Sequence, residues 1–413
     1  MHPKHLSIND YTYELPDEKI ARYPVTERDK AKLLVYKNNN IEESTYQNID
    51  RYLPSGSLLI LNDTKVIEAR ILFQKDTGGV IEIFCLEPLM HHGDISTAMS
   101  QKASVEWLCL IGGASKWKRG QILQKETRFT NHEIIVEAKF IRKVESSFAV
   151  QISWTPPDFT FAEILHSAGN IPLPPYLKRY SESSDEERYQ TVYAAVKGSV
   201  AAPTAGLHFT KSIFDKLQLK KIVTAPLTLH VGAGTFKPVK SITMEGHEMH
   251  EEFIDVDIQT IEKIRNNLNG FITAVGTTSL RTIESLYWLG VKILLSKTIS
   301  LPDLMIEQWE AYELKTKDLT ALEALNTLLQ WMNSNEIHRL ITRTKILIAP
   351  GYEMKITNAL ITNFHQPQST LLLLVAAFIG EDWRRVYDFA LKNEFRFLSY
   401  GDGCLLFRNQ SFF

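Results

Sequence analysis

The chain has 413 residues, of which 44% are hydrophobic and 23% are charged, and its formal net charge is −2. This length is enough to bury at least one sizeable core, and two domains are the natural expectation. The balanced composition excludes a disordered chain, and the near-neutral charge excludes a basic field over the whole protein, so a nucleic-acid site would be a local patch.

The first strand signal lies in the opening 65 residues. Leu58–Leu61 is a short apolar run that predicts a buried strand, and it leads into the turn-prone cluster Asn62-Asp63-Thr64. This segment is expected to begin a domain.

Residues 66–150 have a different pattern. Short runs rich in β-branched and aromatic residues are separated by glycine-containing turns, which predicts a small β-barrel or sandwich inserted into the chain. The runs are Val80–Leu86, Val105–Ile111, Glu133–Phe140 and Phe148–Trp154.

From about residue 155 strands and helices alternate, which predicts α/β layering. The acidic segment Glu182–Glu187 is expected to be a loop, and the stripe from Ile258 to Leu268 predicts a helix capped by Gly270. Further helices are expected at Ser279–Leu289, at Leu319–Met332 with Leu322, Leu325, Leu329 and Met332 on one face, and at Ser369–Ile379 before Gly380; strands are expected at Phe271–Val275, Ile346–Ala349 and Ile356–Ile361.

The cysteines and the apolar runs indicate in which cellular compartment the protein is expected. Cys85, Cys109 and Cys404 form no CxxC pair, which favours small buried side chains in a reducing cytoplasm. The N-terminus lacks the apolar core of a secretory signal, and the longest apolar run, Leu371–Ile379, is far short of the roughly 20 residues of a transmembrane helix. We therefore expect a cytoplasmic protein with no membrane segment.

Two glycine-rich segments carry candidate chemistry. Gly198–Thr210 has small residues that let a backbone approach a ligand, and its imidazole is His208. Leu227–Val239 places His230 in a strand before a glycine turn, which lacks the third glycine of a dinucleotide fingerprint and instead suits the approach of an adenosine moiety. Both histidines could equally be packed core groups.

Two further segments follow predicted strands. In Ala274–Glu284 the strand ends at Val275, Gly276 turns the chain, and a hydroxyl of Thr277, Thr278 or Ser279 is expected to cap a helix. The N-terminus of such a helix attracts a carboxylate or phosphate, with Arg281 as a clamp. In Thr362–Ser369, Asn363 and His365 offer a donor and acceptor pair. For both segments, the competing interpretation is that these polar residues only cap the helix that follows. His247 and His250 lack the HExxH pattern and a further ligand set, so no metal site is expected.

These segments together resemble one enzyme family. GSVAAPTAGLHFT, LTLHVGAGTFKPV, AVGTTSLRTIES, APGYEMKITNALITNFHQPQSTLLLLVAAFIG and FRFLSYGDGCLL are similar to signature segments of the S-adenosylmethionine:tRNA ribosyltransferase-isomerases of queuosine biosynthesis, as are residues 23–36, 58–71, 171–179 and 187–194. The resemblance spans nearly the whole chain. Residues 290–344, which carry Trp309 and Trp331, are longer than in the commoner members.

The resemblance implies a large barrel-like α/β domain from residues 1–65 and 151–413, with a small all-β barrel inserted at 66–150. It also implies a reaction in which the ribosyl group of S-adenosylmethionine is transferred and isomerised onto 7-aminomethyl-7-deazaguanine at the tRNA wobble position. The products are epoxyqueuosine-tRNA, adenine and methionine. S-adenosylmethionine is consumed as a substrate, and neither a cofactor nor a metal is expected.

Candidate residues follow from membership of these segments. The catalytic candidates are His208, His230, His365 and Asp402. The substrate-binding candidates are Thr204, Gly206, Gly232, Gly234, Thr235, Gly276, Thr277, Thr278, Arg281 and Asn363. The RNA-binding candidates are Lys116, Lys118 and Arg119, beside the aromatic Trp117, together with Lys178 and Arg179.

Two alternatives stay open at this point. An S-adenosylmethionine-dependent RNA methyltransferase would need an early strand followed by a GxGxxG-type turn, which the sequence lacks. A non-catalytic RNA-binding module with a β-barrel would bind RNA and release no adenine.

Overall fold

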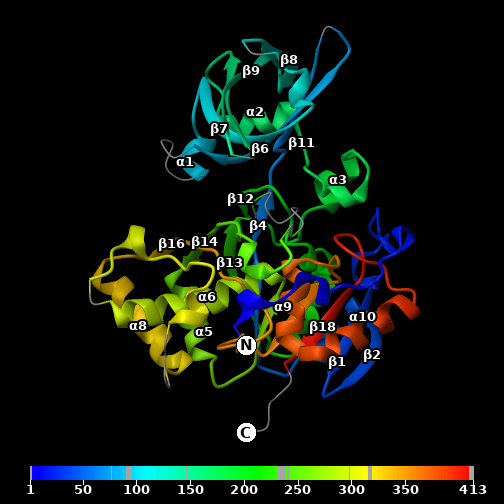
Figure 1. Cartoon of the computed structure of the whole chain (residues 1–413), viewed down its shortest axis with the longest axis vertical. Coiled ribbons are helices and arrows are strands. Elements are labelled where there is room, and N and C mark those ends of the chain that lie inside the picture. The colour runs from blue at the N-terminus through cyan, green and yellow to red at the C-terminus, as the bar shows by residue number, and fades with distance from the viewer. Residues whose placement is uncertain are drawn as a thin grey trace.

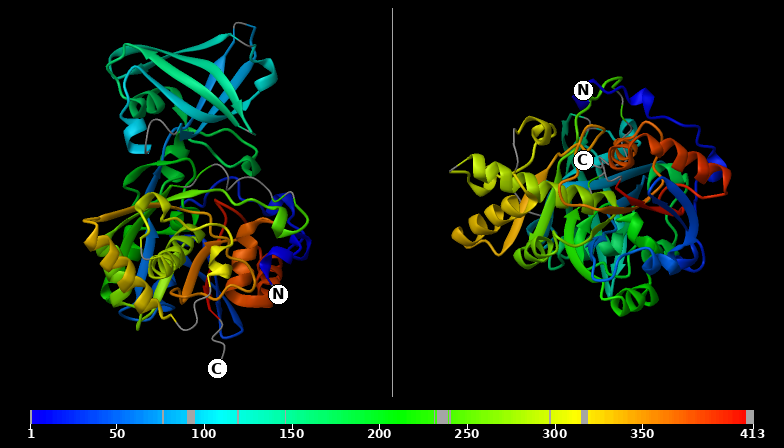
Figure 2. Two further views of the ribbon diagram at one scale, coloured as in Figure 1. Left: turned by 60° about the vertical axis from the view of Figure 1, so that its left-hand side comes forward. Right: turned by 90° about the horizontal axis from the view of Figure 1, so that it is seen from below.

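A computed structural model describes the chain apart from residues 1, 76, 90–94, 119, 146, 231, 233–238, 240, 297, 315–318 and 409–413. It is a mixed α/β structure in which a large body with a nine-stranded sheet carries a smaller, seven-stranded antiparallel sheet at one end (Figure 1). The smaller sheet stands apart from the body in the turned view as well (Figure 2).

The nine-stranded sheet forms the framework of the body. Its strands are β1 (Lys32–Lys37), β2 (Asn40–Thr45), β3 (Leu58–Asn62), β13 (Val223–His230), β14 (Glu252–Asp257), β15 (Ile272–Val275), β16 (Arg339–Thr344), β17 (Ala359–Asn363) and β18 (Gly403–Phe407). They lie in the order β16-β14-β13-β3-β15-β17-β18-β1-β2. The central strands β13, β3, β15 and β17 are parallel. Because helices cover both faces, β3 and β17 are buried at every residue, as expected of central parallel strands.

Helices of very different length pack on this sheet. They are α3 (Ser183–Arg188), α4 (Lys211–Leu219), α5 (Ile258–Asn266), α6 (Thr277–Leu295), α7 (Glu310–Glu313), α8 (Ala321–Ser334), α9 (Thr370–Ile379) and α10 (Trp383–Lys392). The expected helix before Gly380 is confirmed as α9, where the Ser369 side chain caps the first turn and Gly380 ends the helix with a φ of 66°.

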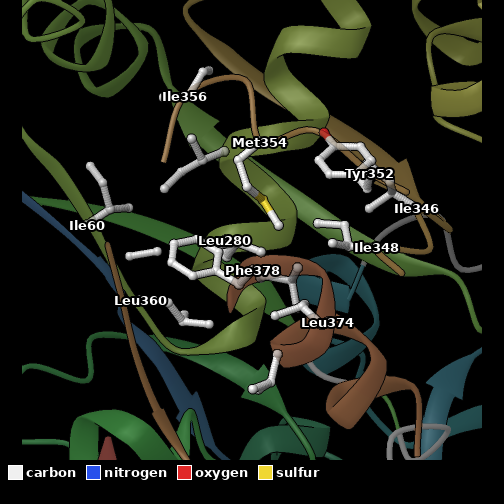
Figure 3. Close-up of a cluster of buried hydrophobic side chains, with 14 of the residues drawn as sticks. Ile60, Leu280, Ile346, Ile348, Tyr352, Met354, Ile356, Leu360, Leu374 and Phe378 are labelled. Atoms are coloured by element: carbon white, nitrogen blue, oxygen red, sulfur yellow. The ribbon is translucent and has the colours of Figure 1, made fainter. Parts of the chain in front are cut away.

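The apolar core of the body lies where α6 and α9 meet the sheet. Leu280 of α6, Leu374 and Phe378 of α9, and Leu360 of β17 meet in one buried cluster (Figure 3). Residues of the segment 346–356 close the cluster from a third side. The start of α6 and the start of α9 are therefore held firmly by apolar contacts beneath them.

The seven-stranded sheet is built from consecutive antiparallel neighbours. Its strands are β5 (Arg70–Gln74), β6 (Val80–Pro88), β7 (Ser104–Gly112), β8 (Ile122–Phe129), β9 (His132–Val144), β10 (Ser147–Thr155) and β11 (Gly169–Asn170), in the order β11-β5-β6-β7-β10-β9-β8. The sheet curls around α2 (Phe161–Ala168), with α1 (Ile95–Met99) beside it (Figure 1). Buried and exposed residues alternate along β7, so one face fills the interior.

The four strands expected between residues 80 and 154 are confirmed, whereas β5 and β8 were not expected. The sequence of β8, ILQKETRF, alternates with charged residues and buries just one of its side chains, Leu123. A pattern so polar gives little apolar signal. The boundary expected at residue 150 falls inside β10, and α2 and β11 continue the same unit. A short parallel pair, β4 (Thr64–Val66) with β12 (Val196–Ser199), lies between the two sheets (Figure 1).

Two expected strands in the body differ from the observed structure. Ile346–Ala349 is not a strand, because its backbone is bound by side chains: the Tyr312 hydroxyl donates to the Leu347 carbonyl and accepts from the Ala349 amide. The strand expected from Ile356 begins three residues later, because the amides of Ile356 and Thr357 donate to the buried Glu284 carboxylate.

The expected loop at Glu182–Glu187 instead forms α3. The Asp185 carboxylate accepts from the Glu182 amide at 2.8 Å, which closes the first turn of the helix. In α8, Leu322 is 49% exposed and Leu328 takes its expected place on the buried face. Helix α5 ends at Asn266 and is capped by Asn267, so Gly270 is not its cap.

The cysteines and helices bear on the remaining expectations. Cys85, Cys109 and Cys404 are all buried and unpaired. Among the described residues, no helix is both long enough and apolar enough to cross a bilayer.

Candidate active site

The main cleft of the body lies where parallel strands end. β15 and β17 are paired through Val275 and Ile361. Their carboxyl ends lie on the same side of the sheet as that of β3, from which the chain continues towards the seven-stranded sheet. Open α/β sheets bind ligands at such an edge, beside a point where strand order or direction changes. β17 meets that condition, because its other neighbour, β18, is antiparallel. The cleft is lined by residues 201–205, 247, 249, 250, 252, 276–278, 281, 346–348, 362–371, 374, 398 and 399, with Tyr176 and Tyr189.

Helix α6 presents its N-terminus to the cleft. Gly276, Thr277 and Thr278 all line it. Gly276 has a φ of 90° and occupies the N-cap without a side-chain bond, so the expected hydroxyl cap was wrong. The Thr278 hydroxyl instead accepts from the buried Asn62 side chain at 3.3 Å. The first amides of α6 are therefore left without a capping side chain at a site that favours an anion.

Arg281 joins the first turn of α6 to the neighbouring segments. It forms an ion pair with Glu252, in which both side chains are less than one tenth exposed, and its Nε donates to the Ile346 carbonyl at 3.2 Å. Its Nη2 is buried and has no hydrogen-bond partner among the described residues. A buried donor without a partner costs about 1–3 kcal/mol, so this atom is set to donate to a ligand in the cleft.

Asn363 supplies a second buried donor from the end of β17. Its Oδ1 accepts from the Thr204 hydroxyl at 2.7 Å, which fixes the orientation of the amide. Its Nδ2 has no protein partner, and the residue is 3% exposed. Both Thr204 and Asn363 line the cleft. The arrangement leaves an amide donor for a ligand oxygen or ring nitrogen.

His365 lies two residues beyond Asn363 on the cleft wall. Its Nε2 is 2.8 Å from the Thr362 hydroxyl, and its backbone amide donates to the Tyr387 hydroxyl at 3.0 Å. Atoms packed around the ring lower the pKa of His365 to about 3. The imidazole is therefore neutral at neutral pH and a weak base, and its conjugate acid would be a strong proton donor.

Comparison with known proteins identifies the family of the chain. The family model described as "Queuosine biosynthesis protein" matches residues 8–406. The chain belongs to the queuosine biosynthesis protein family. A curated relative from Geotalea uraniireducens (strain Rf4), named S-adenosylmethionine:tRNA ribosyltransferase-isomerase, is 34% identical over 411 residues, which is 97% of this chain and 100% of the relative.

A crystal structure of S-adenosylmethionine tRNA ribosyltransferase from Thermotoga maritima is 27% identical. The match covers 96% of this chain and 99% of that chain, with a TM-score of 0.44.

In this member of the queuosine family, the other expected catalytic residues are not among those that line the main cleft. His208, in the 3-10 turn η9 (Thr204–His208), is 4% exposed and stacks on Tyr46 at 4.2 Å between ring centroids. Burial lowers the pKa of His208 to about 3. His230 lies 3.1 Å from the Thr64 hydroxyl, and burial lowers its pKa to about 4.

Asp402 holds backbone groups. Its carboxylate accepts from the amides of Lys32 at 2.9 Å and Arg396 at 2.7 Å, and burial raises its pKa. It therefore fixes the SYGDG segment against β1.

The expected substrate-binding glycines also differ in whether they line the cleft. Gly276 lines the cleft, whereas a Cβ at Gly206 would lie 1.9 Å from the Tyr193 hydroxyl, so close packing requires that glycine. Gly232 has open space around it, and Gly234 and Thr235 lie outside the described residues.

The expected RNA-binding residues differ in availability. Lys116 and Lys118 are exposed on the seven-stranded sheet, and Arg119 lies outside the described residues. Trp117, the aromatic residue beside them, is 9% exposed and donates to the Gln121 carbonyl, so its ring packs inside the protein.

The second expected basic pair is already engaged within the protein. Lys178 pairs with Asp17 at 2.5 Å. Arg179 forms two bonds, of 2.7 and 2.8 Å, to the buried Asp185 carboxylate. The charge of Arg179 is therefore largely compensated.

Several cleft residues were not expected from the sequence. Glu252 follows His247 and His250 in the sequence, but its pairing with Arg281, 29 residues away, has no local signal. Tyr176 and Ser399, whose hydroxyls are 2.6 Å apart, come from segments separated by 223 residues. Among the described residues, no group of three His, Cys, Asp or Glu side chains is placed to hold a metal ion.

Proposed function

We propose that this chain transfers and isomerises the ribosyl moiety of S-adenosylmethionine onto 7-aminomethyl-7-deazaguanine at the wobble position of tRNA. The products are epoxyqueuosine-tRNA, adenine and methionine. The proposal is supported by membership of the queuosine biosynthesis protein family and by the curated relative that carries this enzyme name. One feature of the cleft carries it: buried donors of Arg281 and Asn363 without protein partners, beside the N-terminus of α6.

The donor end of the reaction fits the α6 side of the cleft. The carboxylate of the methionine moiety would accept from the free Nη2 of Arg281 and from the first amides of α6, where the helix dipole favours negative charge. Glu252 neutralises the rest of the Arg281 charge and lies near enough to attract an ammonium group. Thr277 and Thr278 shape the wall around that group.

The chemistry requires a base and an acid close to the ribose. The sulfonium makes the neighbouring 5′-carbon hydrogens acidic. His365, held by Thr362, is our candidate to accept such a proton for a short time, because its lowered pKa makes the imidazolium a strong acid that gives the proton up again. The imidazolium so formed would return the proton to adenine as the bond between adenine and the ribose breaks. The neutral amine of the tRNA base forms the new C–N bond and gives up a proton, and a C–C bond between carbons of the opened sugar closes the cyclopentane ring. A hydroxyl oxygen of the former ribose then forms the epoxide C–O bond at the carbon that carries sulfur, and methionine leaves with the electron pair of the C–S bond. Asn363 would orient the nucleoside through its Nδ2.

The proposal also covers the cofactor requirement, the domains, the tRNA contacts and the cellular location of the protein. S-adenosylmethionine acts as a substrate, and we propose that no separate cofactor takes part. The seven-stranded sheet, in which β5 and β8 approach each other around α2, is proposed to be an inserted all-β barrel domain on a barrel-like α/β domain. The exposed Lys116 and Lys118 on that sheet are proposed to contact the tRNA. We assign the protein to the cytoplasm, where its tRNA substrate is found.

Product analysis tests the proposal. The enzyme is incubated with S-adenosylmethionine and tRNA that carries 7-aminomethyl-7-deazaguanine, and the small molecules are separated by chromatography. Free adenine and methionine, in amounts equal to the modified base formed, are expected. S-adenosylhomocysteine would instead identify a methyltransferase, and tRNA binding without adenine release would identify a binding module. Unmodified tRNA, which lacks the acceptor amine, is the control and should give no adenine.

A further inference from the structure

A second, smaller pocket lies next to the main cleft. It is lined by Pro24, Val25, Arg28, Arg188, Leu207, His208, Ser399 and Tyr400. Ser399 lines the main cleft as well, so the two cavities share a wall. Arg188 is the last residue of α3, which lies between the two sheets in Figure 1. The pocket therefore lies in the region between the two sheets, where a ligand that contacts both of them would bind.

The pocket carries positive charge that protein carboxylates do not pair. Arg28 donates to the carbonyls of Gln190 at 2.6 Å and Glu187 at 2.7 Å, and Arg188 donates to that of Thr26 at 2.9 Å. Both guanidiniums are thereby fixed in place by neutral acceptors. Neither forms an ion pair among the described residues, although the nearby Glu187 carboxylate offsets part of the charge on Arg28. Two fixed guanidiniums close together repel each other and favour an anion between them.

Arg179 provides a contrast a short distance away. It binds the Asp185 carboxylate through two hydrogen bonds, and Asp185 also accepts from the Tyr400 hydroxyl at 2.6 Å. The protein therefore pairs one arginine of this region with a buried carboxylate and leaves Arg28 and Arg188 to carbonyl groups.

Polar atoms around the pocket still lack partners. Nε of Arg188 and Nε2 of His208 are buried and make no hydrogen bond within the protein. His208 is 4% exposed and its position is fixed by the stacked Tyr46 ring. An oxyanion in the pocket would accept from the guanidinium and could accept from the imidazole. Buried atoms of this kind, left open in a rigid frame, indicate a built binding site.

We propose that Arg28 and Arg188 bind a backbone phosphate of the tRNA, so that the nucleotide beside this phosphate enters the main cleft past Ser399. The proposal rests on the proposed function for the identity of the RNA. It assigns the Tyr176 and Ser399 side of the cleft to the acceptor base and leaves the Arg281 side to S-adenosylmethionine. Tyr176 and Tyr189 line that side and offer aromatic rings to a flat base.

The salt dependence of tRNA binding tests the phosphate site. Affinity is measured by fluorescence anisotropy over a range of KCl concentrations for the wild type, Arg28→Gln, Arg188→Gln and the double variant. Loss of this one phosphate contact in the double variant should make the slope of log affinity against log salt shallower by about 0.7, the single-strand value, and each single variant should give part of that change. We expect tRNA affinity to fall roughly tenfold at low salt in each single variant, while S-adenosylmethionine affinity is unchanged.

Arg384→Gln is the matched control. Arg384 also binds a backbone carbonyl, that of Asp10 at 2.8 Å, and lies on the far α10 surface over Trp383. Its removal should leave the slope unchanged. Arg28→Lys and Arg188→Lys keep the charge but lose the forked contacts, so they should keep the slope even if the melting temperature falls. This pair separates loss of a phosphate contact from local unfolding.

The outcomes distinguish this inference from the proposed function. If wild type releases adenine with modified tRNA, and the double Gln variant keeps the wild-type slope and affinity, the phosphate site is wrong and the function stands. If wild type binds tRNA and releases no adenine, the function is wrong, and a reduced slope in the Gln variants would still identify a phosphate site. A slope lost equally in the Gln and Lys variants would mean that the arginines act through folding, and would overturn the inference.

Discussion

The two sheets of this protein use their polar groups differently. At the ends of β15 and β17 in the nine-stranded sheet, buried donors of Arg281 and Asn363 face a cleft without protein partners. The seven-stranded sheet closes over an apolar interior in which Trp107 packs on Phe161 with 4.9 Å between ring centroids. A polar atom left open at a strand end costs stability and is retained for a ligand, whereas a filled interior serves as support. The following predictions test that division.

Replacing Arg281 should have the largest effect. Arg281→Gln removes the proposed donor to the substrate carboxylate and breaks the buried ion pair with Glu252. We expect the affinity for S-adenosylmethionine to fall about 100-fold and the free energy of unfolding to fall by about 3–5 kcal/mol. Titration calorimetry and urea unfolding measure the two effects.

A paired variant separates binding from stability. In Arg281→Met with Glu252→Leu, both charges of the buried pair are gone, and most of the lost stability should return. Binding should stay weak. Wild-type affinity in this double variant would show that the ion pair serves the fold and that the cleft does not use Arg281.

A large effect of another kind is expected in the seven-stranded sheet. Trp107→Leu leaves a cavity beside Phe161 and should destabilise this sheet by about 3 kcal/mol. Affinity for S-adenosylmethionine should not change. Calorimetric melting should show two transitions. The first, from the seven-stranded sheet, should have a melting temperature that S-adenosylmethionine does not change, and the second, from the larger body, should have a melting temperature that S-adenosylmethionine raises. A ligand shift of both transitions together would show that the two sheets unfold as one unit.

Asn363 should have a moderate effect that is confined to catalysis. Asn363→Ala removes the free Nδ2 donor and is expected to lower kcat/KM by roughly 10–100-fold, since a lost hydrogen bond of this kind costs about 1–3 kcal/mol. Thr204→Val removes the hydroxyl that orients the amide and should give part of this loss, whereas Thr204→Ser should retain activity. Equal rates for Asn363→Ala and wild type would remove this residue from the site.

Acid should destabilise the larger body before the seven-stranded sheet. Burial lowers the pKa of His208 in the folded state to about 3, whereas its pKa in the unfolded state is near 6.5. Between these two pH values the unfolded state therefore binds one more proton at His208 than the folded state does. The stability from neutral His208 is complete above pH 6.5 and falls by up to about 1.4 kcal/mol per pH unit as the pH drops towards 3. In the described part of the seven-stranded sheet and its helix, the histidines, His132 and His166, are exposed.

Unfolding measured at several pH values checks this point. His208→Gln should make the free energy of unfolding less steep between pH 6 and 4 than in wild type, even if it is less stable at pH 7. His132→Gln, on the smaller sheet, is the matched control and should leave the slope unchanged. An identical slope for His208→Gln would show that other groups dominate the acid sensitivity.

The sequence predicted the elements whose pattern is local. Alternating apolar residues identified four strands of the smaller sheet, and Ser369 and Gly380 correctly bounded α9. It failed where a distant side chain takes over the backbone. Tyr312 occupies the carbonyl and amide that would have made Ile346–Ala349 a strand, and Glu284 binds the amides before β17.

For the site, the sequence by itself determined which segments contribute polar groups, because glycine turns and hydroxyls after apolar runs mark strand ends. It could not distinguish His365, which lines the cleft, from His208 and His230, which do not. The tertiary structure alone decided that difference, as it decided the pairing of Arg281 with Glu252. The physical reason is that burial and charge compensation depend on neighbours brought close by packing, and these neighbours leave no mark in the local sequence.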